Sequence, residues 1–467
     1  QYCMRDINEI LKDKSLHVVY FIGIGGIGMS ALARYFKSMG KEVAGYDRTE
    51  TPLTKALVNE GMYVHYNQDE IKDIQNIGLV IYTPAVPPDS PAFVYCTNNQ
   101  LPLFKRSEVL QGITKDGFNI CIAGTHGKTT ISTLTAHLLK DSGFGCNAFL
   151  GGISANYQTN FWHSENNVFV VEADEYDRSF LKLSPNIAVI TAMDADHLDI
   201  YGTAAAVEDA FIEFSSKIKE NGCLISPKNL LQANKLNASN KLTYAIENVE
   251  SDTSAVNIKV GEHAYTFDVN YRGEMISGFQ LNMGGRHNIE NALAAITIAK
   301  YLGIDNEKIK DAIQSFKGVK RRFEFILNNS ENIFIDDYAH HPEELRVLIA
   351  GVKELYPNKK CVLIFQPHLY SRTKDLANEF AQSLDRADEV ILLPLYPARE
   401  KPIEGVSSEL ILNKMISKNK SLMEKNELLE YIKNTSPELL VTAGAGDIDM
   451  LLSTIKNILV QEKKQDV

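Results

Sequence analysis

A glycine-rich segment with a lysine and two threonines has the composition of a phosphate-binding loop. It reads GTHGKTT over 124–130, follows the apolar run Phe118–Ala123 and precedes a helical pattern. Backbone N–H groups of such a loop wrap a phosphate, Lys128 would neutralise its oxygens, and the Thr129 hydroxyl would reach Mg²⁺. The alternative is a loop that only caps a helix. The segment predicts a nucleotide site formed by Gly124, Thr125, His126, Gly127, Lys128, Thr129 and Thr130.

Carboxylates and a histidine end two further apolar runs. Val168–Val171 leads into Glu172, and the sequence MDADHLD over 193–199 places His197 among three aspartates. A carboxylate at the carboxyl end of a strand beside a phosphate loop is where a magnesium ligand is expected. Glu172 is therefore predicted to hold Mg²⁺ with Thr129, and His197 to bind a second metal or orient another group. A solvated acidic turn and a structural histidine are the alternatives.

A second glycine motif, GIGGIG over 23–28, follows the apolar run His17–Ile22. Asp47 comes about 20 residues later, as in the dinucleotide-binding fingerprint. Such glycines let the backbone approach a pyrophosphate at a helix N-terminus. The motif alone fits NAD or FAD, another nucleotide diphosphate, or a tight structural turn. A dehydrogenase has no need of the second phosphate loop, whereas a ligase acting on a nucleotide-linked substrate needs both.

The elements that position these residues form three blocks of alternating strand and helix patterns, which is typical of α/β architecture. The blocks are expected as domains over 1–107, 108–318 and 319–467. Helices are expected over Ser30–Met39 and Thr129–Lys140, and a period-two pattern over about 240–280 indicates a small antiparallel insert. Strands are expected at His17–Ile22, Glu42–Tyr46, Leu79–Tyr82, Phe118–Ala123, Val168–Val171, Ile187–Thr191, Ile333–Ile335, Cys361–Phe365, Glu389–Leu393 and Leu439–Thr442.

Composition narrows the class of protein. A length of 467 residues predicts two to four domains. No apolar run of about 18 residues is present, and Gln1–Lys14 lacks the apolar core of a signal peptide, so a cytoplasmic protein without a membrane partner is expected. The six cysteines form no CxxC pair, which argues against a zinc site or a disulfide framework. The net charge of −11 argues against a nucleic-acid partner.

Nine ordered segments together resemble the Mur ligase family over nearly the whole chain. The segments are GIGGIGMS (Gly23–Ser30), AGTHGKTT (Ala123–Thr130), EADEYDRSF (Glu172–Phe180), DADHLDIYG (Asp194–Gly202), GRHNIENALAA (Gly285–Ala295), GVKRRFE (Gly318–Glu324), DDYAHHPEE (Asp336–Glu344), QPHLYSRT (Gln366–Thr373) and YPARE (Tyr396–Glu400).

The resemblance implies three α/β domains. They are an N-terminal Rossmann-like domain for a UDP-sugar, a central P-loop ATPase-like parallel sheet for ATP and Mg²⁺, and a C-terminal Rossmann-like lid for an amino acid. The implied reaction joins L-alanine to the carboxylate of UDP-N-acetylmuramic acid through an acyl phosphate, giving ADP and phosphate. A monomer or homodimer is expected. A carbamylated lysine is not expected, because 211–213 reads Phe-Ile-Glu.

Site residues follow from the matching segments. The UDP-sugar is assigned to Gly23, Gly25, Gly26, Gly28, Met29, Ser30 and Asp47. ATP contacts outside the loop are assigned to His287, Asn288, Asn291 and Arg322, and amino-acid contacts to Tyr338, His340 and Arg372. The catalytic set is Lys128, His197, Arg322, Asp337 and His340. Helix capping is an alternative role for the two asparagines, and Leu369 stands where the family often has arginine.

The sequence leaves three alternative functions open. Within the family, a recycling ligase adds a tripeptide to the same UDP-sugar. From another class, a nicotinamide-dependent oxidoreductase would use Gly23–Gly28 and Asp47 but leave the second loop unexplained. A non-catalytic nucleotide-binding scaffold would leave Lys128, Glu172 and Arg322 without a role.

Overall fold

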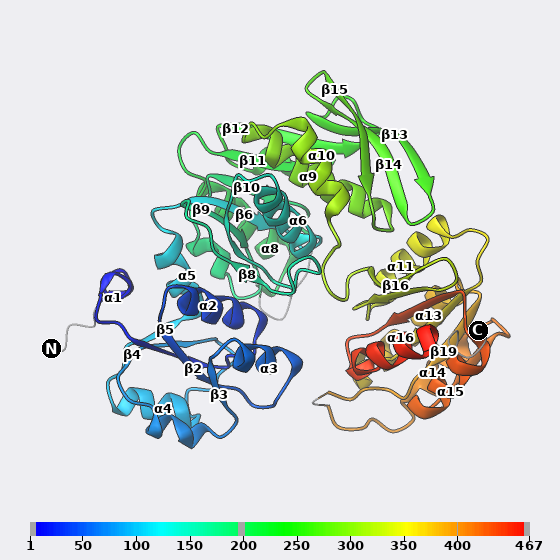
Figure 1. Cartoon of the computed structure of the whole chain (residues 1–467), viewed down its shortest axis with the longest axis horizontal. Coiled ribbons are helices and arrows are strands. Elements are labelled where there is room, and N and C mark those ends of the chain that lie inside the picture. Colours follow the sequence, from blue (N-terminus) through cyan, green and yellow to red (C-terminus); the bar gives the residue numbers. More distant parts are fainter. Residues whose placement is uncertain (1–5, 195–200, 399, 462–467) are drawn as a thin grey trace. The chain divides into compact units, whose positions relative to one another are not determined.

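Three β-sheets follow one another along the chain (Figure 1). The computed structural model describes residues 6–194, 201–398 and 400–461. The chain forms two compact units. Unit 1 comprises Gln1–Val256, Asp268–Phe279 and Glu290–Phe316, and unit 2 comprises Asn257–Phe267, Gln280–Ile289 and Lys317–Val467. The first two sheets belong mainly to unit 1, and the third sheet belongs to unit 2.

The first sheet is parallel, and its central strand is buried along its whole length, as expected when helices cover both faces. In spatial order its strands are β3 (Tyr63–His65), β2 (Glu42–Tyr46), β1 (Val18–Ile22), β4 (Ile77–Tyr82) and β5 (Leu103–Lys105). Its helices are α1 (Ile7–Lys12), α2 (Ile27–Ser38), α3 (Pro52–Asn59), η1 (Gln68–Asp73), α4 (Pro91–Asn98) and α5 (Arg106–Thr114). All three strands expected here are confirmed. Helix α2 begins three residues before its expected start, within the glycine motif at Ile27.

The second sheet has ten strands. In spatial order they are β15 (Glu274–Leu281), β14 (Ala264–Tyr271), β13 (Thr253–Gly261), β12 (Asn240–Ile246), β11 (Cys223–Pro227), β10 (Ile187–Ile190), β6 (Phe118–Ala123), β9 (Val168–Glu172), β7 (Asn147–Phe149) and β8 (Phe161–Trp162). The associated helices are α6 (Lys128–Asp141), η2 (Ser179–Lys182), α8 (Ala204–Ser216), η3 (Ala233–Lys235), α9 (Arg286–Tyr301) and α10 (Asn306–Ser315). Strands β6, β9 and β10 confirm the expected parallel core, and all three are parallel neighbours.

The expected antiparallel insert extends the central sheet. Strands β13, β14 and β15 are sequential neighbours joined by two-residue links at 262–263 and 272–273. Links this short permit only antiparallel pairing. Strand β12 pairs in parallel with both β11 and β13, so it continues the same sheet. The alternating pattern correctly predicted strands over 240–280, but β12, inside that range, is parallel to both neighbours and so departs from the expected antiparallel insert.

The third sheet is parallel except for its first edge strand. In spatial order its strands are β16 (Glu324–Asn328), β17 (Ile333–Asp337), β21 (Leu439–Ala443), β18 (Cys361–Phe365), β19 (Glu389–Leu392) and β20 (Lys420–Leu422). Its helices are α11 (Pro342–Leu355), α12 (Tyr370–Asp375), α13 (Ala377–Leu384), α14 (Ser408–Lys414), α15 (Lys425–Thr435), η4 (Asp447–Leu451) and α16 (Leu452–Gln461). The four strands expected here are confirmed.

The five cysteines that the structure describes are buried free thiols. None of the described helices combines the length and the apolar character that a membrane span requires.

Candidate active site

The phosphate loop lies between the end of β6 and the start of α6, against the end of β10. Gly124 has φ +122°, and a Cβ there would stand 2.0 Å from the Thr191 hydroxyl oxygen. Gly127 has φ +77° and would meet Asn291 Oδ1 at 2.7 Å. The Thr191 hydroxyl donates to the carbonyl of His126. Both glycines are therefore required by backbone conformation and by close neighbours.

Lys128 makes an ion pair that sequence reasoning did not identify. Its Nζ donates to both carboxylate oxygens of Glu175 at 2.8 Å. The Glu175 side chain is only 1% exposed, and the Tyr201 hydroxyl donates to its backbone carbonyl. Glu175 follows β9 three residues after Glu172, so the acidic segment EADE was the available signal. The carboxylate fixes the lysine ammonium beside the loop.

The two residues predicted to hold magnesium are in contact. Thr129 Oγ1 donates to Glu172 Oε1 at 3.1 Å, and the Gly151 N–H donates to Oε2 at 3.0 Å. Adjacent hydroxyl and carboxylate oxygens are the donor chemistry that Mg²⁺ takes. His197, the third predicted ligand, lies outside the described residues. Within the described ranges no group of three histidine, cysteine or acidic side chains is arranged around a metal position.

In the first glycine motif, Asp47 holds the loop itself. The Gly25 N–H donates to Asp47 Oδ2 at 2.7 Å. Gly23 has φ +89°, a left-handed conformation that favours glycine. Met29 and Ser30 are buried in α2, and the Ser30 N–H donates to the carbonyl of Gly26 at 2.8 Å. A diphosphate here would therefore meet the N–H groups at the start of α2, because those of residues 23–26 are bonded within the chain.

Arg106 adds a cation that the motif does not contain. Its guanidinium lies over Gly28, where a Cβ would stand 3.1 Å from Arg106 Nη1. The residue opens α5, directly after β5. Arginine suits phosphate recognition because its planar fork donates to two oxygens at once. Sequence reasoning missed it because 78 residues separate it from the glycine it covers.

The start of α9 carries the three residues assigned to further ATP contacts. In unit 1, Asn291 faces Gly127 of the phosphate loop, as the distance above shows. In unit 2, Asn288 is buried, and its side chain donates to the carbonyl of Gly284 at 2.7 Å. His287 is exposed. The structure thus joins Asn291 to the loop and gives Asn288 a contact with the backbone before the helix.

In unit 2 the adjacent arginines have different surroundings. Arg321 Nε donates to buried Asp336 at 2.9 Å, and its Nη2 donates to the carbonyl of Gly444 at 2.7 Å. Arg322 is exposed. Arg321 is therefore the structural member of the pair, and Arg322 is the one whose side chain is accessible to a ligand. The motif-based choice of Arg322 is compatible with this arrangement.

Asp337 ends β17 and is held by two backbone donors. The N–H groups of Phe323 and Ala339 each donate to it at 2.8 Å. Burial raises the pKa of Asp337 to about 6, against the lowering effect of those two bonds and of Arg322. Burial disfavours the charged form of a carboxyl group. The group is thus poised to change charge close to neutral pH.

Tyr338, His340 and Arg372 belong to one ring cluster at the carboxyl edge of the third sheet. The ring centres of Tyr338 and His340 are 5.2 Å apart, and His340 and His368 are 6.4 Å apart. Arg372 Nη1 contacts His368 Nδ1 at 3.2 Å. His368 stacks on Tyr396 with 5.8 Å between ring centres. The structure therefore brings the three predicted residues together and adds His368 and Tyr396.

The protonation of His368 follows from its neighbours. Burial, the charge of Arg372 and that of His340 lower its pKa. Because arginine only donates, Nδ1 is the acceptor and the neutral ring carries its proton on Nε2. Both added residues lie in segments that the sequence had singled out, QPHLYSRT and YPARE, but neither segment indicated that the rings stack.

Leu369 has a conformation unusual for its residue type. Its φ is +72°, and its N–H donates to the carbonyl of Tyr396 at 3.0 Å. A branched residue in the left-handed region is strained, and such strain concentrates at functional sites. Leu369, where the sequence departs from the family pattern, is thus held by a backbone hydrogen bond to Tyr396 of the ring cluster.

Comparison with known proteins covers nearly the whole chain. Three profiles match: Mur ligase family, catalytic domain, over 18–117; Mur ligase middle domain over 122–299; and Mur ligase, glutamate ligase domain, over 321–447. The UDP-N-acetylmuramate–L-alanine ligase of Flavobacterium psychrophilum is 48% identical over 450 residues, 95% of this chain and 98% of the relative. That of Christiangramia forsetii is 46% identical over 465 residues, 98% of this chain and 100% of the relative.

A solved structure supports the same relationship. The UDP-N-acetylmuramate–alanine ligase of Thermotoga maritima superimposes with a TM-score of 0.80 at 28% identity, over 96% of this chain and 99% of that one. Sequence identity near one half across three ordered domains, together with the shared fold, leads to one conclusion. This chain belongs to the Mur ligase family.

Proposed function

We propose that this protein joins L-alanine to the carboxylate of UDP-N-acetylmuramic acid with ATP, in cytoplasmic peptidoglycan precursor synthesis. Relatives 46–48% identical over nearly their full length carry that activity in their names. The observation that carries the proposal is the contact of Thr129 with Glu172 at 3.1 Å, directly beside Lys128. This arrangement suits phosphoryl transfer, for which a nicotinamide enzyme has no use.

We assign one ligand to each domain. Residues 1–107 would bind the UDP-sugar through Gly23–Gly28, with Arg106 as an added cation. Residues 108–318 would bind ATP through Gly124–Thr130 and Asn291. Residues 319–467 would bind the amino acid through the cluster of Tyr338, His340 and Arg372. The contacts above support these assignments by grouping each set at one sheet edge, where α/β folds bind their ligands.

The first step would transfer the γ-phosphoryl group to the muramyl carboxylate. The carboxylate oxygen attacks the γ-phosphorus, and the bond from that phosphorus to the bridging β-phosphate oxygen breaks. The products of this step are ADP and an acyl phosphate. Lys128 would move from Glu175 toward the phosphate oxygens and offset their growing charge. Bound Mg²⁺ would supply further charge neutralisation, and Thr129 and Glu172 are the described residues that would hold it. Removing one such contact typically costs about 3 kcal/mol of transition-state stabilisation.

The second step would form the amide bond. The neutral amine of alanine attacks the carbonyl carbon of the acyl phosphate, phosphate leaves, and the amine loses a proton. His340 and His197 remain the two candidates for accepting that proton. His340 Nδ1 lies 2.9 Å from the carbonyl oxygen of Tyr338, which leaves Nε2 as the atom for such a role. Arg322 and Asp337 would orient the reacting groups.

One assay separates the candidate functions. The protein is incubated with ATP, Mg²⁺ and UDP-N-acetylmuramic acid, and phosphate release is compared with alanine, serine, glycine and L-Ala-γ-D-Glu-meso-diaminopimelate. Release stimulated by alanine supports the proposal. Release with the tripeptide alone supports the recycling ligase. No release with any of them, together with NADH binding, favours the oxidoreductase and overturns the proposal.

A further inference from the structure

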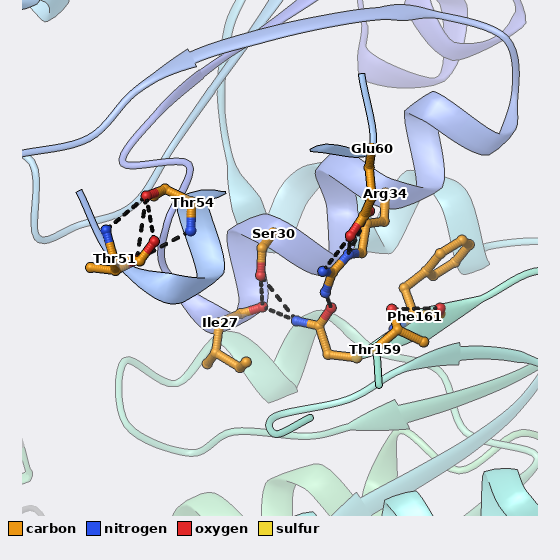
Figure 2. A network of polar contacts seen from close by, with 9 residues as sticks. Ile27, Ser30, Arg34, Thr51, Thr54, Glu60, Thr159 and Phe161 are labelled. Carbon is orange, nitrogen blue, oxygen red and sulfur yellow. Dashed lines mark hydrogen bonds and ion pairs between the residues drawn. The ribbon is translucent and has the colours of Figure 1, made fainter. Parts of the chain in front are cut away.

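One buried amide contacts the helix that follows the first glycine motif. Asn160, immediately before β8, is fully buried. Its Nδ2 donates to the carbonyl of Ile27 at 2.8 Å and contacts the Ser30 hydroxyl oxygen at 3.0 Å (Figure 2). The Ser30 hydroxyl donates to the same carbonyl. A residue 30 positions after the end of the predicted ATP loop thus contacts the first turn of α2.

The side-chain oxygen of Asn160 accepts a hydrogen bond from a buried arginine. Arg34 Nη1 donates to Asn160 Oδ1 at 2.5 Å, while Nε and Nη2 donate to Glu60 at 2.9 and 2.7 Å (Figure 2). Arg34 is 6% exposed. Its charge is compensated by Glu60 at the end of α3. Bidentate charge-assisted bonds of this kind define an orientation as well as an energy.

The surrounding packing is apolar. Helix α2 packs on β7 and β8, where the Tyr35 ring lies 5.7 Å from Phe149 and 5.9 Å from Phe161. Apolar packing is favourable but non-directional. The polar network around Asn160 therefore supplies the directional contacts that set how the first turn of α2 is oriented.

The same asparagine is connected to the predicted magnesium ligand. Its backbone carbonyl accepts from the Leu150 N–H at 3.0 Å. The next N–H, that of Gly151, donates to Glu172 Oε2 at 3.0 Å, and Glu172 in turn accepts from Thr129. A Cβ on Gly151 would lie 2.3 Å from Glu172 Oε2, so only glycine allows this approach. A short series of bonds thus links both glycine motifs.

We propose that Asn160, held by Arg34, is a positioning residue that sets the distance between the UDP-sugar site and the ATP site. The proposal rests on the proposed function. The muramyl carboxylate belongs to the UDP-sugar and the γ-phosphate to ATP. Their alignment therefore depends on the distance between the Gly23–Gly28 loop and the Gly124–Thr130 loop. A misplacement of about 1 Å can cost roughly 100-fold in rate. The Asn160 side chain donates to the Ile27 carbonyl and the Ser30 hydroxyl, so it occupies none of the N–H groups that a diphosphate at the start of α2 would use.

The test compares turnover with binding in Asn160→Ala. We expect kcat for alanine-dependent phosphate release to fall by about 30- to 100-fold. The Kd values of UDP-N-acetylmuramic acid and of an unreactive ATP analogue with Mg²⁺, each titrated alone, should change less than about threefold. Arg34→Lys, which keeps the charge beside Glu60 but loses the planar fork, should give a smaller fall in kcat with the same unchanged Kd values.

Asn147→Ala is the matched control. Asn147 is also buried, lies on β7 and bonds the backbone at 166 and 168, but it contacts no residue of α2 through a side-chain bond that the structure shows. It should lose similar thermal stability and keep kcat within about threefold. Equal kcat in the Asn160 and Asn147 variants would overturn the proposal, as would a Kd that rises in step with the loss of turnover.

Failure of the proposed function remains distinguishable. Wild-type turnover with alanine is measured first, and its absence would count against the ligase assignment whatever Asn160 does. If wild type turns over, the variants alone decide the positioning role. Should Asn160→Ala not fold, Arg34→Lys carries the same comparison of kcat with Kd, and an unchanged kcat there would reject the role.

Discussion

At the residue scale, the ion pair of Lys128 with Glu175 separates activity from stability. Lys128→Ala should abolish ATP-dependent amide formation, because no other described cation lies on the loop. It should also destabilise unit 1, by up to about 3 kcal/mol, since the buried Glu175 carboxylate loses its ion pair with Lys128. Phosphate release and thermal unfolding of the variant measure the two effects.

The double variant Lys128→Ala with Glu175→Gln is the control for that experiment. Removing both charges should restore most of the lost thermal stability and none of the activity. Near-normal turnover in either variant would reject the phosphate-loop assignment. A double variant as unstable as the single one would show that the ion pair is not the source of the stability loss.

The raised pKa of Asp337 predicts a pH dependence of stability. The folded protein holds this proton more tightly than the unfolded chain, because its pKa is about 6 rather than 3.8. The free energy of unfolding should therefore fall as pH rises from about 4 to about 6. Asp337→Asn removes this dependence. The free energy of unfolding of the variant, relative to wild type, should therefore be about 1–2 kcal/mol higher at pH 7 than at pH 4.5. Its Tm relative to wild type, measured at both pH values, should be correspondingly higher at pH 7.

Asp388 provides a control of opposite sign. Burial raises its pKa, but bonds from the Cys361 N–H and Lys353 outweigh that effect and leave the pKa below its ordinary value. Its stabilisation is present above pH 4 and lost as pH falls. Asp388→Asn should therefore have a lower Tm relative to wild type at pH 7 than at pH 4.5. The same trend in both variants would contradict the environment assigned to Asp337.

At the element scale, two glycines bracket the predicted ATP-binding helix and differ in their surroundings. Gly124→Ala would place a methyl group 2.0 Å from the Thr191 hydroxyl and should displace the loop from β10. We expect ATP-analogue binding to weaken at least about tenfold, a loss of roughly 1.4 kcal/mol. Titration of the analogue in the presence of Mg²⁺ measures this loss.

Gly143→Ala is the corresponding control. Gly143 follows α6 and has φ +80°, but a Cβ there meets nothing within 4 Å. The substitution should cost only the strain of the left-handed backbone, about 1–2 kcal/mol, and leave binding unchanged. Equal binding in the two variants would indicate that the Gly124 loop does not hold the phosphate.

At the scale of the whole molecule, the predicted ligands are divided between the two units. Hydrogen exchange with an ATP analogue and Mg²⁺ should slow amides around 123–131 and 172–175, which belong to unit 1. Exchange with L-alanine should slow amides around 337–344 and 366–373, which belong to unit 2. Protection by alanine in unit 1 alone would contradict the assignment of the amino acid to the third sheet.

The patterns of the three sheets were predictable because buried parallel strands are continuous apolar runs. Strand β6 was predicted with its observed bounds, and so was β18. Short strands such as β7, β8 and β20 were missed, since two or three residues carry too little pattern to stand out. The glycine loops were recognisable because their backbone conformations admit few other residues at Gly23, Gly124 and Gly127.

The sequence by itself determined the three-block α/β architecture, the two glycine motifs, and the family resemblance with the ligase function that it implies. Each depends on residues close together in the chain, where periodicity and local backbone requirements leave a direct trace. Glu175, His368 and Tyr396 lie in segments that match the family, but the sequence does not show which residues they contact.

Only the tertiary structure decided which of these residues meet. It placed Arg106 over Gly28, paired Lys128 with Glu175, and gave Arg321 rather than Arg322 the buried partner. It also linked Asn160 to the first turn of α2 across 130 positions. Such pairings depend on how sheets and helices pack, and burial then decides which charges need a partner. That information lies in contacts between distant segments, which a single sequence does not display.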